Sequence, residues 1–255
     1  MELQEQILWK TQPLAYIFRK EINPEKTTFL TPSELNLMSA ISELLRQNLA
    51  VPRKVLGRAR NVVNRMVYSS PPEFAMRVAT DLTDEEKLAL YWQVLKLPRN
   101  SVALEVGSYL GASACVIGSA IARRNGLLHC VDTWQNQAMD TPEWDTWPEF
   151  QANTEPLGAV VVPHRGFSTD VARHLSVALD FLFIDGDHSE EAVDADLSAW
   201  LPKVKPGGIV AMHDVGWAEG VRKGIEKHLR GRITSEKRLP QRGGWQNLMI
   251  CKFLG

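Results

Sequence analysis

The spacing of apolar residues changes near residue 100, from a helical period to an alternation of strands and helices. Before that point, the capping-box pattern Thr31–Glu34 precedes a helical stripe of apolar residues: Leu35, Met38, Ile41, Leu45 and Leu49. A second capping box, Thr83–Glu86, opens a helix that stops before Pro98. Its expected buried face consists of Leu88, Tyr91, Trp92 and Leu95. The pattern predicts a helical N-terminal extension over residues 1–80, and a second domain over residues 81–255.

From residue 101 onward, short apolar runs have the length and the β-branched content of buried parallel strands. They occupy residues 101–106, 127–131, 159–162, 179–184 and 208–212. Helical stretches separate them, notably 113–124, 147–154, 190–200 and 219–230. This alternation predicts a parallel sheet covered on both faces. The tail differs, because two runs on either side of Gly243-Gly244 predict an antiparallel pair: Ile233–Leu239 and Gln246–Phe253. The expected fold is a doubly wound α/β domain with a mostly parallel, seven-stranded sheet.

Charge and composition narrow the possible partners. The 255 residues are 44% hydrophobic, and 29 basic against 30 acidic side chains give a net charge of -1, so we expect no nucleic-acid partner. A basic stripe at residues 53–65 is typical of a solvated helix face. No apolar run approaches the roughly 18 residues of a membrane span. We expect no membrane association, and the N-terminal helices are expected to cover a pocket or form a homo-oligomer contact.

The cellular location follows from two further features. The start, Met1–Lys10, has neither the basic beginning nor the apolar stretch of a secretory signal. The cysteines, Cys115, Cys130 and Cys251, are widely spaced, which favours buried free thiols over a disulfide or zinc framework. Both features predict a cytoplasmic protein.

A glycine turn follows the first expected strand. Gly107 and Gly111 lie between that strand and a helix that begins near Ser113. Glycines there allow a sharp turn and a close approach of a ligand to the backbone. Their spacing differs from the Gly-x-Gly-x-x-Gly that seats a dinucleotide pyrophosphate. We expect a cofactor at this turn, with Glu105 and Ser108 among the residues that bind it.

Asp132 ends the second expected strand, where a carboxylate can accept hydrogen bonds from both hydroxyls of a ribose. A turn or helix-cap aspartate is the simpler interpretation when the residue is taken alone. Together with the glycine turn, the position favours the ribose role. Thr133 and Trp134 follow directly, and Trp134 is expected to stack near the adenine. Ser168 follows the third strand, where the edge of an adenine would lie, although a plain turn explains it nearly as well.

Residues 101–255 resemble the class I S-adenosylmethionine-dependent methyltransferases, and in particular the bacterial macrocin and mycinamicin sugar O-methyltransferases. The segments that support the resemblance are Phe183–Ser189, and Leu201–Gly208 leading into His213-Asp214. The resemblance implies that S-adenosylmethionine is the cofactor. It also implies methyl transfer to a hydroxyl of a small molecule, such as a sugar, glycoside or polyol. It does not extend to the N-terminal helices or to the insertion between Asp132 and Pro148.

Candidate chemistry gathers where the fourth and fifth strands end. Asp185 ends the fourth strand and His188 follows three residues later, while His213 and Asp214 end the fifth. Because parallel strands end at one edge of the sheet about 4.8 Å apart, these side chains can converge. The resemblance implies that His188 is the general base, beside Asp185. A loop residue that caps the next helix is the plain alternative.

A metal site is a further expectation from the resemblance. Carboxylates matching Asp185 and Asp214 hold a Mg²⁺-type ion in the similar enzymes, with an acidic residue where this chain has His213. Magnesium prefers oxygen ligands and imidazole favours softer ions, so His213 either shifts the preference toward Mn²⁺ or points elsewhere.

Aromatic residues are frequent in the expected loops above the sheet edge: Trp134, Trp144, Trp147 and Trp217. The segment 133–146 has no strong pattern of its own, which is typical of a lid. Tryptophans there and at Trp217 are suited to lining a sugar face, although most tryptophans are core residues.

Two other functions remain open at this point. A non-haem iron oxygenase could use His188 and His213 with Asp185 or Asp214 as its two-histidine-one-carboxylate site. The glycine turn with Asp132 argues against it, because such an enzyme needs no nucleoside pocket there. A non-catalytic S-adenosylmethionine-binding module is the second alternative, and the intact pair of His188 and Asp185 does not favour it.

Overall fold

The computed structural model describes residues 70–136, 144–240 and 246–255. The helices and the basic stripe expected before residue 70 lie outside the described residues, as do the middle of the expected lid and the Gly243-Gly244 turn. The described residues belong to one compact unit, Pro71–Gly255. The division at residue 80 and the homo-oligomer contact stay predictions.

The described unit is built on a seven-stranded sheet in the order β3-β2-β1-β4-β5-β7-β6. Its strands are β1 Val102–Val106, β2 Leu127–Asp132, β3 Val161–Arg165, β4 Leu179–Ile184, β5 Val204–Met212, β6 Ile233–Pro240 and β7 Gln246–Phe253. Strands β1 to β5 are parallel, and β7 pairs antiparallel with both β5 and β6. The predicted doubly wound sheet with a terminal antiparallel pair is confirmed.

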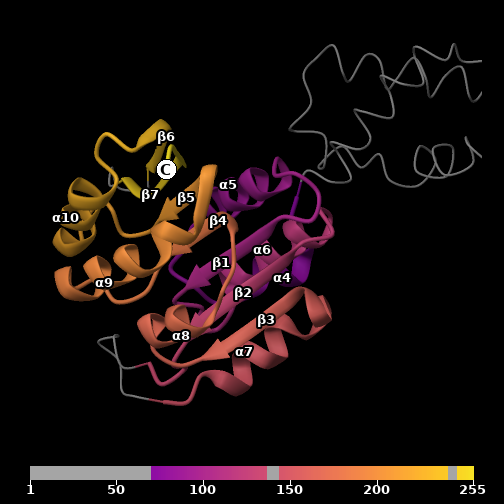
Figure 1. Ribbon diagram of the computed structural model, residues 1–255. Coiled ribbons are helices and arrows are strands. Elements are labelled where there is room, and N and C mark those ends of the chain that lie inside the picture. The colour runs from indigo at the N-terminus through magenta and orange to yellow at the C-terminus, as the bar shows by residue number, and fades with distance from the viewer. Residues whose placement is uncertain (1–69, 137–143, 241–245) are drawn as a thin grey trace, which may run out of the picture. The chain divides into compact units, whose positions relative to one another are not determined.

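Helices cover both faces of the sheet (Figure 1). On one side lie α4 Glu73–Arg77, α5 Asp84–Leu95, α6 Ala112–Ala122 and α7 Trp147–Thr154. The other side has α8 Ser168–His174, α9 Glu190–Trp200 and α10 Glu219–His228. Short 3-10 turns, Glu155–Val160 and Leu201–Lys203, lead into β3 and β5. Among the described helices, none is both long and apolar enough to cross a membrane.

Two apolar cores result, one on each face of the sheet. Alternate residues of β1 point to opposite sides, so Ala103 joins the core under α5 and α6, while Leu104 joins the core under α9 and α10. Helix α6 is buried all round, because it lies between the sheet and α5. The three cysteines are buried free thiols, as expected. Both cores fix the carboxyl ends of the strands relative to one another.

The structure differs from the sequence prediction in several elements, and β5, for example, begins at Val204 and not near residue 208. Strand β3 begins at Val161 rather than near residue 159, because the chain turns through a left-handed Gly158 (φ 52°) just before it. As an edge strand, β3 also includes polar residues that the apolar pattern omits. Helices α4 and α8 were not predicted, since each is shorter than the window that reveals a helical period.

The buried face of α5 is also rotated from the expected one. Leu90, Tyr91 and Val94 are fully buried, whereas Leu88 and Trp92 are only partly covered. The contact with α6 selects this face, on which Lys87 also lies and donates to the carbonyl of Met76 (3.1 Å). The capping box is confirmed, and it leaves Glu86 on the buried side of the helix.

Candidate active site

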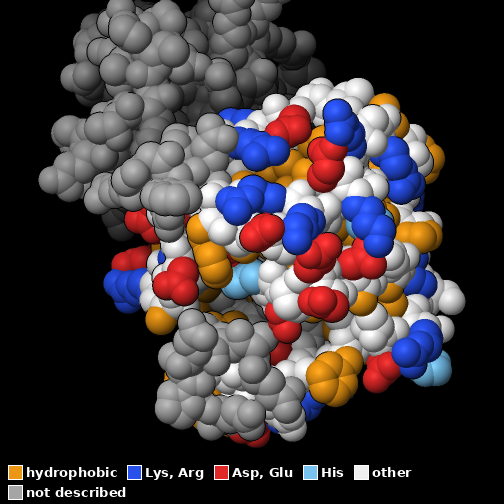
Figure 2. All heavy atoms as spheres, turned by 90° about the vertical axis from the view of Figure 1, so that its left-hand side faces the viewer, with side chains coloured by type: hydrophobic (Ala, Val, Ile, Leu, Met, Phe, Trp, Pro, Cys, Tyr) orange, Lys and Arg blue, Asp and Glu red, His pale blue; other side chains and the backbone are white. Residues whose placement is uncertain are grey.

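A cavity of about 920 Å³ opens at the carboxyl ends of β1, β2, β4 and β5. Figure 2 views this edge, toward which the parallel strands of Figure 1 point, and shows histidine and acidic side chains together at the surface. The loop Ala79–Leu82, which leads into α5, forms part of the wall. The cavity therefore lies at the switch point where strand order reverses, where ligands bind in such sheets.

The glycine turn is a left-handed loop pressed against the neighbouring strand. Gly107 has φ 85°, and a Cβ atom there would lie 2.1 Å from the carbonyl oxygen of Asp185. Gly111 has φ 87° and serves as N-cap of α6. Gly107 lines the cavity and Gly111 does not. At Gly107, only glycine permits both the backbone conformation and the close approach.

Asp132 organises this turn from the end of β2. Its Oδ2 accepts hydrogen bonds from the backbone N–H groups of Ser108 and Tyr109, both at 2.8 Å. Its Oδ1 accepts from the N–H of Trp134 at 2.7 Å. A carboxylate has about four lone-pair sites, so one remains for a ligand hydroxyl. The side chain lines the cavity, but it has room for one ribose hydroxyl and not for the two that the sequence prediction assumed.

Glu105 lies behind the turn and does not line the cavity. It is fully buried, and its Oε2 accepts a hydrogen bond from the hydroxyl of Ser108 (2.8 Å). Burial raises the pKa of Glu105 to about 7, against hydrogen bonds with Ser113 and Ser108 that lower it. Ser108 and Ser113 both line the cavity. Glu105 thus supports the cavity wall through the two serines.

Trp134 does not lie where the sequence suggested. Its side chain is fully buried against Trp147 and Phe150, with ring centroids 4.6 Å away in each case, and it does not line the cavity. Thr133, its neighbour, does line the cavity. The large apolar ring packs in the core while the shorter polar side chain faces the opening.

Ser168 lines the cavity at the start of α8, together with a residue that sequence reasoning missed. Ser168 Oγ accepts a hydrogen bond from Trp200 Nε1 (2.7 Å). Asp196 of α9 is buried and also lines the cavity. Burial raises the pKa of Asp196 to about 6, although a hydrogen bond with Ser168 opposes the shift. The only sequence signal for Asp196 is an acidic residue between the apolar positions Val193 and Leu197.

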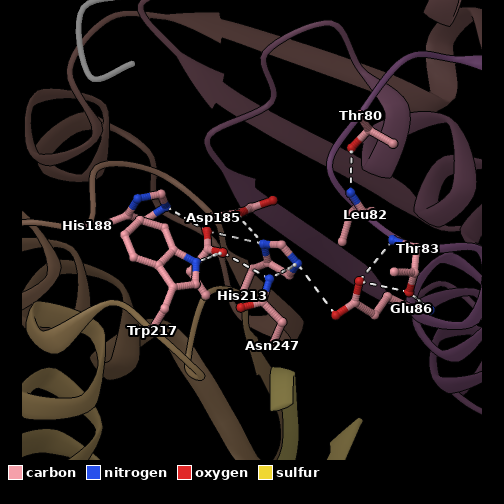
Figure 3. Close-up of polar contacts among 10 residues, drawn as sticks. Thr80, Leu82, Thr83, Glu86, Asp185, His188, His213, Trp217 and Asn247 are labelled. Carbon is pink, nitrogen blue, oxygen red and sulfur yellow. Dashed lines mark hydrogen bonds and ion pairs between the residues drawn. The ribbon is translucent and has the colours of Figure 1, made fainter. Parts of the chain in front are cut away.

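His213 is buried, and Figure 3 shows its ring between Asp185 and Glu86. Its Nδ1 lies 3.1 Å from Asp185 Oδ1 and 3.2 Å from Asp214 Oδ2, so Nδ1 carries a proton and donates to them. Its Nε2 lies 3.1 Å from Asn247 Nδ2 and 3.6 Å from Glu86 Oε1. Both ring nitrogens therefore face protein groups rather than the cavity.

Asp214 is the centre of the polar cluster. Oδ2 accepts from His188 Nε2 (2.7 Å) and from His213 Nδ1. Oδ1 accepts from Trp217 Nε1 (2.7 Å) and from Asn247 Nδ2 (3.0 Å). Asp214 has a left-handed backbone (φ 56°). Its four lone-pair sites are all used by protein N–H groups.

The carboxylates and histidines shift each other's pKa values. Burial lowers the pKa of His213, but Asp185, Asp214 and Glu86 outweigh it and raise that pKa to about 12. Burial raises the pKa of Asp214, yet hydrogen bonds from both histidines hold it well below its usual range. The hydrogen bond to Asp214 raises the pKa of His188. Asp214 and the two histidines therefore favour one another's charged forms.

The expected metal ligands Asp185, His213 and Asp214 lie together, but His213 Nδ1 donates a hydrogen to the two carboxylates instead of offering a lone pair. Asp185, His188 and Asp214 have ligand atoms within 4.8 Å of one another, whereas His213 is not part of this group. His188 directs an N–H, not a lone pair, at Asp214, whose oxygens have no free site. A cation bound to Asp214 would displace these donors. Asp185, His188 and Asp214 are close enough to hold an ion, but only if these hydrogen bonds break.

Two residues of the cluster were missed by sequence reasoning. Asn247 comes from β7, and Glu86 comes from the first turn of α5. Asn247 has no motif around it in the sequence. Glu86 was visible only as the last residue of a capping box, a pattern that concerns the helix and says nothing of the cavity.

Comparisons with known proteins agree with this geometry. Residues 104–215 match a family model described as a methyltransferase domain. This span runs from β1 to just beyond β5, and includes the glycine turn, Asp132, Asp185, His188 and Asp214.

Solved structures share the fold at low identity. The O-methyltransferase TomG from Streptomyces achromogenes, involved in tomaymycin synthesis and solved with SAM, has TM-score 0.57 and 14% identity over 77% of this chain and 96% of its own. An O-methyltransferase from Bacillus cereus, solved with SAH, has TM-score 0.54 and 15% identity over 93% and 95%. The Podospora anserina methyltransferase PaMTH1, bound to SAH, has TM-score 0.54 and 13% identity over 80% and 97%.

The sheet order is that of the class I methyltransferase fold, and within it residues 104–215 form a methyltransferase domain.

Proposed function

We propose that the chain transfers the methyl group of S-adenosylmethionine to a hydroxyl of a small molecule, and that the acceptor is a sugar, glycoside or polyol. The observation that supports this most directly is the pair formed by His188 and Asp214 at the cavity. The similarity to the O-methyltransferases of Streptomyces achromogenes and Bacillus cereus supports oxygen as the receiving atom.

His188 is suited to be the general base. Asp214 accepts the hydrogen on Nε2, which leaves Nδ1 of the neutral ring with its lone pair available. The hydroxyl oxygen attacks the methyl carbon, the bond from that carbon to sulfur breaks, and the sulfonium becomes the neutral thioether of S-adenosylhomocysteine. The hydroxyl proton passes to His188. Asp214 stabilises the imidazolium that forms.

The cofactor is expected to lie between the glycine turn and Asp132. Gly107, Ser108 and Ser113 would face its amino-acid part, and Asp132 the ribose. Thr133 and Ser168 line the part of the cavity where the adenine would lie. Asp185, beside Gly107 and 3.1 Å from His213, would separate the cofactor from the acceptor.

An aromatic wall beside the base favours a sugar-like acceptor. Trp217 is 54% exposed, and its ring meets that of His188 edge to face at 5.0 Å. Its indole N–H is fixed by Asp214, so the ring is held at the cavity. Rigid tryptophan faces suit the apolar faces of sugar rings.

The oxygenase alternative lacks support in the described residues. Both nitrogens of His213 face protein groups, so it cannot share an ion with His188. The non-catalytic alternative is less consistent with an oriented His188 at the cavity.

Calorimetry with S-adenosylhomocysteine, followed by a screen of glycosides and polyols with radiolabelled methyl donor, tests the proposal. We expect cofactor binding, and label transfer to at least one acceptor that disappears in His188→Ala. Transfer to amines or thiols alone would contradict the choice of hydroxyl.

A further inference from the structure

Glu86 lies outside the stretch that matches the methyltransferase domain, yet it reaches the polar cluster. It belongs to the first turn of α5 and is fully buried. Figure 3 shows its side chain pointing from that helix toward His213. A buried carboxylate is costly unless it is paired, so its partners indicate what it does.

The two oxygens of Glu86 have different partners. Oε2 accepts hydrogen bonds from the backbone N–H and the hydroxyl of Thr83, both at 2.9 Å, which completes the capping box. Oε1 has no hydrogen bond in the described part of the chain, and its ion-pair partner is His213 Nε2 at 3.6 Å. The capping box fixes one oxygen and thereby holds the other against the imidazole.

The imidazole transmits this position to the site. Nε2 is held between Glu86 Oε1 (3.6 Å) and Asn247 Nδ2 (3.1 Å), and this orientation of the ring places Nδ1 beside Asp185 and Asp214. A ring flip would remove the donor from both carboxylates. Asp214 Oδ2 also accepts from His188, so a displaced His213 would change the environment of His188.

We propose that Glu86 is a positioning residue of the methyl-transfer site, which orients the His213 ring and through it Asp214 and His188. The inference rests on the proposed function for the role of His188. The proposal makes the N-terminal cap of α5 part of the site around His188. The cap directly follows the Ala79–Leu82 loop, which lines the same cavity.

The test is histidine-ring ¹⁵N NMR of the full-length protein at one fixed pH, comparing wild type with Glu86→Gln. Glutamine can still complete a capping box, so the helix keeps its cap while the charge facing His213 is lost. The matched control is Glu85→Gln, which makes the same change at the exposed neighbouring residue. The His188→Asn and His213→Asn variants assign the two rings.

We expect Glu86→Gln to shift the ring resonances of both His213 and His188, and Glu85→Gln to shift neither. In a His213→Asn background, Glu86→Gln should leave His188 unchanged, because the proposed connection is broken. Unchanged His213 resonances in Glu86→Gln, or a His188 shift that persists without His213, would overturn the proposal.

Two further measurements keep the result interpretable. Thermal unfolding of Glu86→Gln should be cooperative. If that variant does not fold, Glu86→Asp takes its place in the same comparison, because the shorter side chain withdraws the carboxylate from the His213 ring. Calorimetry of the wild type with S-adenosylhomocysteine tests the proposed function separately, since its failure would leave the NMR comparison standing.

Discussion

His188 Nε2 and Asp214 Oδ2 lie 2.7 Å apart at the mouth of the cavity, one on the loop after β4 and the other at the end of β5. The contact joins the ends of two strands that are neighbours only in the folded sheet. Because it occupies Nε2 of His188, Nδ1 is the ring nitrogen that remains for the proposed methyl acceptor.

Replacing His188 by alanine should lower the methyl-transfer rate by about 10²-fold, the usual scale for losing a general base. The affinity for S-adenosylhomocysteine should change by no more than a few-fold, because the residue faces the acceptor. Steady-state kinetics measures the methyl-transfer rate, and calorimetry measures the affinity for S-adenosylhomocysteine. A rate close to wild type would leave His188 as a loop residue that precedes α9.

The pH profile should reflect the same contact. The hydrogen bond to Asp214 raises the pKa of His188, and only the neutral ring accepts a proton, so activity should rise with pH through an inflection above the ordinary histidine value of about 6.5. In Asp214→Asn the charged partner is gone and the inflection should move to lower pH. The measurement is kcat/KM for the acceptor across pH 5 to 9 in both proteins. An inflection that is unmoved in the variant would argue against the pair.

Asp132→Ala should weaken S-adenosylhomocysteine binding by about ten-fold or more, because a charged acceptor for the ribose is lost and the backbone of the glycine turn loses its partners. Calorimetry measures the effect. Glu226→Gln, at an exposed position on α10, is the control and should bind like wild type. Equal affinity in Asp132→Ala would place the nucleoside elsewhere.

Gly107→Ala should destabilise the fold by about 2 kcal/mol or more, since it combines a left-handed backbone with a clash against the Asp185 carbonyl. Gly231→Ala has a similar φ of 73° but open space around it, and should cost less. Denaturant unfolding gives the loss of stability in both variants. The difference between them is the cost of the steric clash with Asp185, apart from the cost of the left-handed backbone. Equal losses would mean that the contact with Asp185 is easily relieved.

Excess chelator should leave methyl transfer unchanged, because Asp214 has no lone-pair site for an ion in the observed network. Activity assays with chelator, and with added Mg²⁺ or Mn²⁺, check this. Loss of activity on chelation with recovery on adding metal would show that the network rearranges around an ion.

The sequence was sufficient for the fold because alternation of short apolar runs and helical stretches determines a doubly wound sheet almost alone. It was also sufficient for Asp185, His188 and Asp214, which gather because parallel strands end at one edge. Strand β3 was misplaced because an edge strand lacks a continuous apolar run.

The orientation of His213 could not be predicted. Its position at a strand end follows from the sequence, but its ring is turned by Glu86 and Asn247, which lie on separate elements. Trp134 could not be assigned either, because a tryptophan after a strand can pack inward or face a ligand. Both questions depend on packing between segments far apart in the chain.

The insertion of β7 between β5 and β6 has a consequence for how the protein is made. This strand supplies Asn247 to the site and covers the edge of β5, yet it is translated after all the other described strands. On the ribosome, β1 to β5 can pair while that edge stays open, exposed to other nascent chains. The glycine turn and the ends of β1, β2 and β4 can therefore form during synthesis, whereas the polar cluster around Asp214 is complete only after Asn247 has left the exit tunnel.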